Sequence, residues 1–262
     1  MTMDDSMLVP FHNDLQRAAH LLRLIKDFRD FAATPVPTEI ASGCPSWQSA
    51  EDLHSAASHV RTDLPIFAGS IHLYVCGRFE YFIRELITAI GDEIAASSTD
   101  YATLPAVVRD ELKNRTLEIA QNPHRYGYNQ SAAEQLLITL SRSFQPAAAG
   151  VPVQISSALL SVTESNMHSR MMADVFKRVN IPSVWPEVGK QASMKSHLNK
   201  STDGECTNEA QAQLDKAMKD RNGIAHPTSA TTFPDADQVL KVVEYLRVLS
   251  QVLVDLSKVP RA

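Results

Sequence analysis

Apolar residues recur at steps of three and four along most of the chain, and this spacing places them on one face of an α-helix. The clearest stripe predicts a long helix over about residues 66–97, and a second predicts a helix over about 235–258. Two weaker stripes predict helices over about 11–33 and 208–226. Because each apolar face needs a partner, these four segments predict the core of an antiparallel helical bundle.

The segment from about residue 100 to 205 is expected to add shorter helices that lie against this bundle, since turn-forming residues interrupt its helical stretches. Only residues 151–155 show a short alternating pattern, which is too little to predict a sheet. The pattern therefore predicts an all-α fold in which residues 1–262 form one domain, a bundle with a helical elaboration.

Composition supports a globular fold, and the net charge excludes a surface that binds nucleic acid throughout. The chain has 262 residues, of which 44% are hydrophobic, so a substantial core is expected. Its net charge is −5, whereas a protein whose whole surface grips nucleic acid is usually strongly basic. Any contact with nucleic acid is therefore expected in a local pocket.

The three cysteines, Cys44, Cys76 and Cys206, are odd in number and widely spaced. They indicate neither a disulfide framework nor a metal site, and they fit a reducing cytoplasm. The N-terminal residues lack a signal-peptide pattern, and no apolar run approaches the roughly 20 residues that cross a bilayer. We therefore expect a cytoplasmic protein that has no membrane contact.

The residues best suited to catalysis lie where the helix over about 208–226 is expected to end. Pro227 disfavours helical angles at His226, so His226 is expected at the C-terminal end of that helix, where exposed carbonyls favour a protonated imidazole. Asn222 lies four residues earlier and shares a face with His226. Arg221 lies five residues earlier, about 140° round an ideal helix, but its long side chain can reach the same phosphate.

These side chains suit the cleavage of RNA. A histidine can take the proton of a 2′-hydroxyl or protonate a leaving 5′-oxygen, and an arginine can grip a phosphate while charge develops. Asn222 can hold a phosphate oxygen or orient the ring of His226. Gly223 costs the helix about 1 kcal/mol relative to alanine, which favours the close approach of another backbone or a ligand. No metal or cofactor is expected.

Simpler interpretations stay open for each of these residues. His226 can be an ordinary helix cap and Arg221 a solvated side chain, because the two residue types occur at this spacing by chance. Glu80, at the edge of the apolar stripe of the long helix, either orients the Arg221 site or pairs with Arg84. His72 in the same helix is interpreted as structural.

Two larger groups of side chains also have two interpretations. Four aromatic residues of the long helix either stack on bases or, as we favour, belong to the core: Tyr74, Phe79, Tyr81 and Phe82. Seven basic residues either follow an RNA backbone or form a solvated helix face: Arg170, Lys177, Arg178, Lys190, Lys195, His197 and Lys200.

Residues 221–226 resemble the Arg-polar-(three residues)-His motif of the HEPN superfamily. Residues 77–86 and 168–180 are similar to the RiboL-PSP-HEPN branch of that superfamily, and the resemblance covers most of the chain from about Ile66 onward. It implies a HEPN-like bundle and a metal-independent endoribonuclease that acts as a toxin or defence effector, often as a homodimer with two motifs in one cleft.

By the same resemblance, Arg221 and His226 take the catalytic positions, Asn222 takes the polar one, and the partners are RNA and an antitoxin or inhibitor protein. One departure concerns Thr228, because HEPN toxins that are silenced by an adenylylating partner carry a tyrosine two positions after the histidine. The competing function is a non-catalytic HEPN-like scaffold or a module that binds RNA or a partner.

Overall fold

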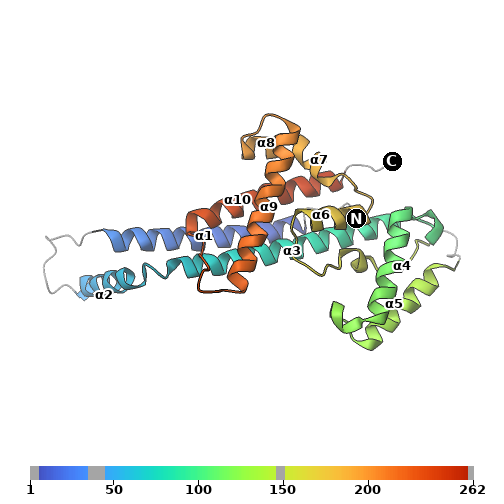
Figure 1. The fold of residues 1–262 in the computed structure, drawn as a ribbon, viewed down its shortest axis with the longest axis horizontal. Coiled ribbons are helices and arrows are strands. Elements are labelled where there is room, and N and C mark those ends of the chain that lie inside the picture. Colours follow the sequence, from blue (N-terminus) through green and yellow to red (C-terminus); the bar gives the residue numbers. More distant parts are fainter. Residues whose placement is uncertain (1–5, 35–44, 146–150, 259–262) are drawn as a thin grey trace. The chain divides into compact units, whose positions relative to one another are not determined.

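The computed structural model describes residues 6–34, 45–145 and 151–258, and these residues are arranged as α-helices and short 3₁₀ segments (Figure 1). No β-strand occurs within these ranges, and residues 151–155 are irregular, so the predicted all-α fold is confirmed. No helix of the described ranges combines the length and the apolar character that a bilayer span requires. Cys44 lies outside the described residues.

The ten helices found in the described ranges are α1 (Leu8–Ala33), α2 (Pro45–Val60), α3 (Leu64–Ala96), α4 (Ala106–Gln121), α5 (Gln130–Ser143), α6 (Ser169–Arg178), α7 (Val184–Lys190), α8 (Ala192–Leu198), α9 (Asp203–Ala225) and α10 (Ala236–Ser257). The 3₁₀ segments are η1 (Tyr101–Thr103), η2 (Pro123–Tyr126) and η3 (Ser157–Ser161).

The four long helices, α1, α3, α9 and α10, occupy the ranges expected from the apolar stripes, with differences at their ends. The largest difference is at α9, which begins at Asp203 because the Thr202 hydroxyl accepts a hydrogen bond from the amide of Glu205 (3.3 Å) and caps the first turn. The sequence pattern instead predicted that this helix begins near residue 208.

The described chain forms two compact units. The first, here the motif unit, comprises residues 12–78 and 216–247, and it contains Arg221 and His226. The second, here the elaborated unit, comprises residues 79–215 together with segments near both termini. Each of the four long helices contributes residues to both units.

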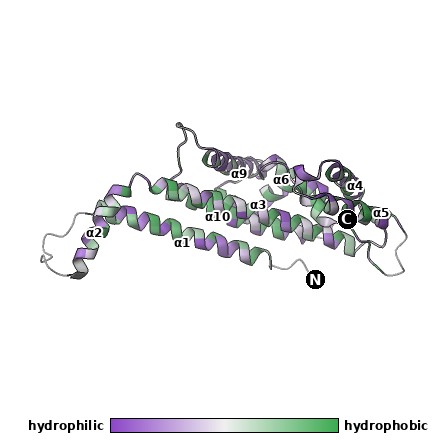
Figure 2. Ribbon diagram, turned by 90° about the horizontal axis from the view of Figure 1, so that it is seen from below, coloured by the Kyte–Doolittle hydropathy of each residue, from purple (hydrophilic) through white to green (hydrophobic). Residues whose placement is uncertain are grey.

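In the motif unit, α1 runs antiparallel to both α3 and α10. Arg78 near the end of this part of α3 donates from Nε to the Asp14 carboxylate near the start of α1 (2.6 Å). At the other end of α1, Lys26 forms an ion pair with Asp237 in the first turn of α10. Figure 2 shows apolar and polar residues alternating along α1, as expected of a helix with one packed face.

An apolar groove lies between α1 and α3 within the motif unit, with a volume of about 560 Å³. The side chains of Leu24 and Phe67 are 63% and 62% exposed, so the groove is open to solvent. Its other apolar walls are Ala18, Leu21, Ile25, Ile71 and Tyr74.

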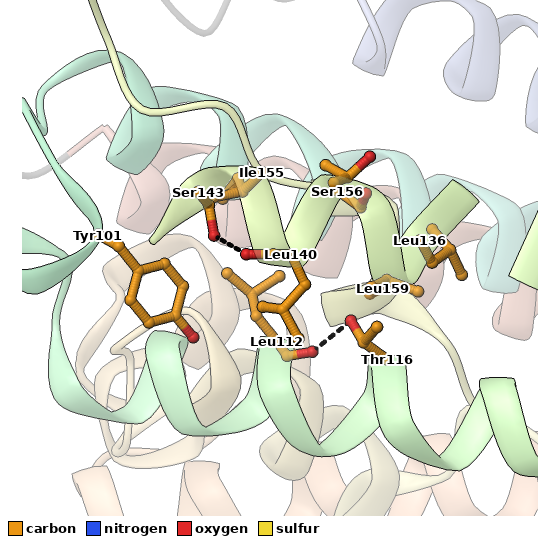
Figure 3. Close-up of a pocket in the computed structure, with 10 residues that line it drawn as sticks. Tyr101, Leu112, Thr116, Leu136, Leu140, Ser143, Ile155, Ser156 and Leu159 are labelled. Atoms are coloured by element: carbon orange, nitrogen blue, oxygen red, sulfur yellow. Dashed lines mark hydrogen bonds between the residues drawn. The ribbon is translucent and has the colours of Figure 1, made fainter. Parts of the chain in front are cut away.

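In the elaborated unit, Phe11 stacks on Phe82 with ring centroids 4.9 Å apart, and α4 packs on α5 and η3. A small apolar pocket of about 10 Å³ remains beside α4 and α5 (Figure 3). The hydroxyls of Thr116 and Ser143 at this pocket donate to their own helix carbonyls (both 2.7 Å). The pocket is therefore a packing gap that holds at most one water molecule.

Candidate active site at the end of helix α9

Helix α9 ends at Ala225, and His226 is the first residue beyond it, directly before Pro227. The proline ring explains this end, because it disfavours helical angles at the residue before it. The turn that follows is held by hydrogen bonds between Thr228 and Thr231, in which the amide of Thr228 donates to the Thr231 hydroxyl (2.8 Å). The motif therefore ends in a structured turn.

The apolar side of this last turn is fixed by Ile224, which is 7% exposed. Ile224 packs against Gly69 of α3, and so does Phe233 from the segment that leads to α10. A Cβ atom at Gly69 would lie 2.7 Å from the Phe233 ring and 3.6 Å from the Ile224 side chain. Gly69 thus provides the close approach that lets both side chains reach α3.

The polar side of the same turn faces solvent. Arg221 is partly exposed, and Asn222 and His226 are exposed. The Arg221 guanidinium donates from Nη1 to the Asn222 side-chain oxygen (3.2 Å), and the backbone amide of His226 donates to the Asn222 carbonyl (3.1 Å). Because His226 is exposed, its ring can be reached by a substrate and can exchange a proton with it.

Asn222 therefore contacts Arg221, whereas the sequence had offered a phosphate oxygen or the His226 ring as its partner. This contact restrains the guanidinium at the surface of the helix end. A planar, permanently charged donor group in such a position is suited to a phosphate.

Gly223 is exposed, and a Cβ atom built there would meet nothing within 4 Å. The close approach expected at this glycine is therefore absent within the described chain. The exposed surface beside Gly223 leaves room for a second chain or for a substrate.

Glu80 belongs to the elaborated unit, where its carboxylate accepts a hydrogen bond from the Met167 amide (3.3 Å). Arg84 donates to the Thr163 hydroxyl (3.1 Å) instead of pairing with Glu80. The suggested ion pair between Glu80 and Arg84 is therefore wrong. The supporting role of Glu80 at the Arg221 site stays a prediction.

The aromatic residues of α3 divide into two groups. Phe79 and Phe82 are buried, as predicted for core residues, whereas Tyr74 and Tyr81 are 44% and 51% exposed. The core prediction is wrong for the two tyrosines because they lie off the buried stripe of the helix.

The continuous basic track suggested for the second half of the chain is interrupted by ion pairs. Arg178 is 4% exposed, and it pairs with Asp174 and Glu111. The other paired residues are Lys190 with Glu187, Lys195 with Asp203, and Lys200 with Glu209. Arg170 and Lys177 remain on the exposed face of α6, beside an open hollow that Pro182 also lines.

Within the described ranges, no group of three or more His, Cys, Asp or Glu side chains lies close enough together to hold a metal ion. The two cysteines that the structure describes, Cys76 and Cys206, are buried and unbridged. Burial raises the pKa of the Cys206 thiol, which makes it a poor nucleophile.

In a comparison with known protein families, residues 48–258 of the chain match the RiboL-PSP-HEPN family. The chain belongs to the RiboL-PSP-HEPN family. The match extends further toward the N-terminus than the resemblance expected from about Ile66, and it includes the whole of α3, α9 and α10. Comparisons with curated proteins and with solved structures find no match.

Membership places the chain in the HEPN superfamily, in which nucleases are frequent and in which domains bind RNA and often dimerise. The matched range contains the Arg221–His226 motif and the α3 residues that pack against it. Sequence reasoning about this RiboL-PSP-HEPN chain missed Gly69 and Phe233. The available signal was a glycine within the apolar stripe of a long helix, which often marks a close approach.

Proposed function

We propose that this RiboL-PSP-HEPN protein is a metal-independent endoribonuclease, with Arg221 and His226 as its catalytic residues and Asn222 as a supporting polar residue. One observation carries the proposal. The last turn of α9 is anchored through Ile224 on its apolar side, while Arg221 and His226 reach solvent and Asn222 contacts the guanidinium.

The chemistry follows from the properties of these groups. The His226 ring takes the proton of a 2′-hydroxyl, whose oxygen then attacks the adjacent phosphorus. The bond from phosphorus to the 5′-oxygen breaks, and that oxygen takes a proton from a second acid or from water. Arg221 stabilises the negative charge that grows on the phosphate oxygens. The products end in a 2′,3′-cyclic phosphate and a 5′-hydroxyl.

A homodimer provides the second proton-transferring group that a single motif lacks. Each motif carries a single histidine, whereas the reaction uses both a base and an acid. Two copies of the chain whose motifs share one cleft bring together two His226 rings and two Arg221 side chains. The exposed surface at Gly223 is free for such an approach.

We further propose that the protein is a toxin or defence effector that an inhibitor protein restrains. Thr228 stands where a tyrosine is adenylylated in some HEPN toxins, so silencing is expected to occur by protein contact and not at that position. Expression of the wild type is expected to arrest bacterial growth, and His226→Ala is expected to relieve the arrest.

The decisive experiment is RNA cleavage in EDTA by purified wild type, Arg221→Ala and His226→Ala, with Lys219→Ala as the matched control. Lys219 is an exposed cation on the same helix end but outside the motif. We expect Arg221→Ala and His226→Ala to lower kcat/KM about 100-fold or more, and Lys219→Ala to have little effect.

Equal activity in all four proteins would exclude the assignment. RNA binding by the wild type without any cleavage would instead favour the non-catalytic module. Labelled products that lack a 2′,3′-cyclic phosphate end would rule out attack by the 2′-hydroxyl.

A further inference from the structure

His72 of α3 is a buried histidine with an unusual hydrogen-bond arrangement. It is 1% exposed, and its Nε2 lies 2.8 Å from the backbone oxygen of Ala217 in α9. A carbonyl oxygen can only accept, so Nε2 carries the hydrogen and donates. The other ring nitrogen, Nδ1, is buried without a hydrogen-bond partner in the described structure.

Stability alone does not explain a histidine at this position. Burying an unpartnered polar atom costs free energy, and an apolar side chain of similar size would avoid that cost. An apolar side chain makes non-directional contacts, which allow two helices to slide and rotate against each other. A hydrogen bond is directional and fixes one arrangement of the two helices. The hydrogen bond of His72 therefore fixes how α3 and α9 lie against each other.

The bond leads directly to the motif. In an α-helix the carbonyl of one residue accepts the amide of the residue four positions later, so the helical pattern pairs Ala217 with the amide of Arg221. His72 thus donates to the peptide group that begins the turn carrying Arg221. The Cys76 sulfur lies 3.6 Å from the same Nε2 and helps to enclose the bond.

A second contact holds the far end of this segment. Gly69, three residues before His72, packs against Ile224, seven residues after Ala217. Residues 69 and 72 lie on the same face of α3. This face therefore holds the last two turns of α9 at two points, one apolar and one polar.

We propose that His72 is a positioning residue for the cleavage reaction, acting through its hydrogen bond to Ala217 to fix the rotation and axial position of the α9 segment that carries Arg221. This inference rests on the proposed function. A slip of one residue along α9 would turn Arg221 by about 100°, away from its place beside the substrate.

The first test measures hydrogen exchange and needs no RNA. His72→Leu removes the donor and keeps an apolar side chain, whereas His72→Gln places an amide donor near the position of Nε2. Val75→Ala, a cavity variant at a fully buried residue of the same helix, is the matched control for general destabilisation. We expect His72→Leu to raise amide exchange in residues 216–226 more than Val75→Ala does, and His72→Gln to restore much of the protection.

The second test is steady-state cleavage of a defined RNA by the same proteins. The Arg221 guanidinium acts in the transition state, so its displacement should slow the chemical step. We therefore expect His72→Leu to lower kcat about 10- to 100-fold with little change in KM. His72→Gln is expected to recover most of kcat, and Val75→Ala to retain it.

The outcomes separate the two proposals. Unchanged exchange in His72→Leu, or the same change in His72→Leu and Val75→Ala, would overturn the positioning role whether or not the protein cleaves RNA. A wild type without cleavage refutes the proposed function, and the exchange data alone then decide whether His72 orders the segment. A loss of kcat in His72→Leu that His72→Gln fails to recover would also contradict the positioning role of His72.

Discussion

Two glycines beside the motif sit in opposite environments. Gly69 faces Phe233 so closely that an added Cβ would lie 2.7 Å from the ring, while the same atom at Gly223 would have no described neighbour within 4 Å. Both are helical, so both carry the usual entropic penalty of glycine in a helix. Among the described residues, only Gly69 of these two therefore has a packing partner that requires glycine.

Alanine at these positions is expected to act in opposite directions. Gly69→Ala forces Phe233 to shift and should lower the free energy of unfolding by about 1–3 kcal/mol. Gly223→Ala has open space and should raise it by up to about 1 kcal/mol. Urea unfolding followed by circular dichroism measures both changes.

The activity of Gly223→Ala tests whether a substrate or a second copy of the chain approaches this glycine. If a substrate or a second copy approaches that surface, Gly223→Ala will cleave RNA poorly although it is more stable. A Gly223→Ala protein that is both more stable and fully active would show that nothing approaches the glycine closely.

At the level of single residues, the sequence was informative where a property is local. Pro227 located the end of α9, and the apolar stripe of α3 placed Phe79 in the core. The burial of Arg178 had no such signal, because its partner Glu111 lies far away along the chain. The contact between Gly69 and Phe233 depends in the same way on distant segments.

Two histidines link helices within the motif unit. His72 joins α3 to α9, and the ring of His12 in α1 donates a hydrogen bond to the backbone carbonyl of Arg247 in α10. Burial lowers the pKa of both rings below 6.5, although the backbone hydrogen bonds oppose the shift. For His72, Asp220 also raises the pKa and Lys216 lowers it.

These shifts predict that mild acid weakens the helix contacts. A histidine whose pKa is lower in the folded state binds fewer protons there than in the unfolded chain, so stability falls as pH falls below about 6.5. The contribution is fully present above this value and is lost toward the folded-state pKa. Urea midpoints between pH 7.5 and 5.5 should decrease for the wild type.

Variants identify the source of that decrease. His72→Gln and His12→Gln should each show a smaller fall in midpoint over this range, because glutamine does not titrate. Carboxylates such as that of Asp237, whose pKa is lowered by Lys26, lose their contribution at more acidic pH. An equal fall in the wild type and both variants would contradict the assignment to these rings.

At the level of elements, periodicity predicted helices well and their ends less well. At the start of α10, the Asp235 side chain accepts from the Gln238 amide (2.8 Å), and the Gln238 side chain accepts from the Asp235 amide (3.0 Å). Residues 184–198 form two short helices, α7 and α8, that meet at Gln191. Such short-range breaks depend on packing that a single stripe does not encode.

The proposed dimer makes a prediction at the scale of the whole assembly. If one cleft contains both motifs, a mixture of Arg221→Ala and His226→Ala chains forms some dimers that retain one intact Arg221 and one intact His226. Such mixed dimers should recover part of the activity that each variant lacks alone. Cleavage after co-refolding or co-expression measures this recovery.

The control is each variant refolded with itself at the same total concentration. Sedimentation at that concentration should show a species of twice the chain mass. A monomer that cleaves RNA, or a mixture no more active than its parts, would contradict the shared cleft.

The division into two compact units had no counterpart in the sequence. The motif unit joins residues 12–78 to residues 216–247, and no composition change or linker marks the boundary within α3 or α9. Local pattern predicts helices because neighbours determine them. Which distant helices pack together depends on the shapes of whole faces.

The groove between α1 and α3 has a practical consequence at the bench. Its open apolar walls resemble surfaces that environment-sensitive dyes such as anilinonaphthalene sulfonate recognise. The native protein should therefore fluoresce with such a dye before any heating, and a dye-based melting curve will start from a high baseline. Ellipticity will follow its unfolding more faithfully.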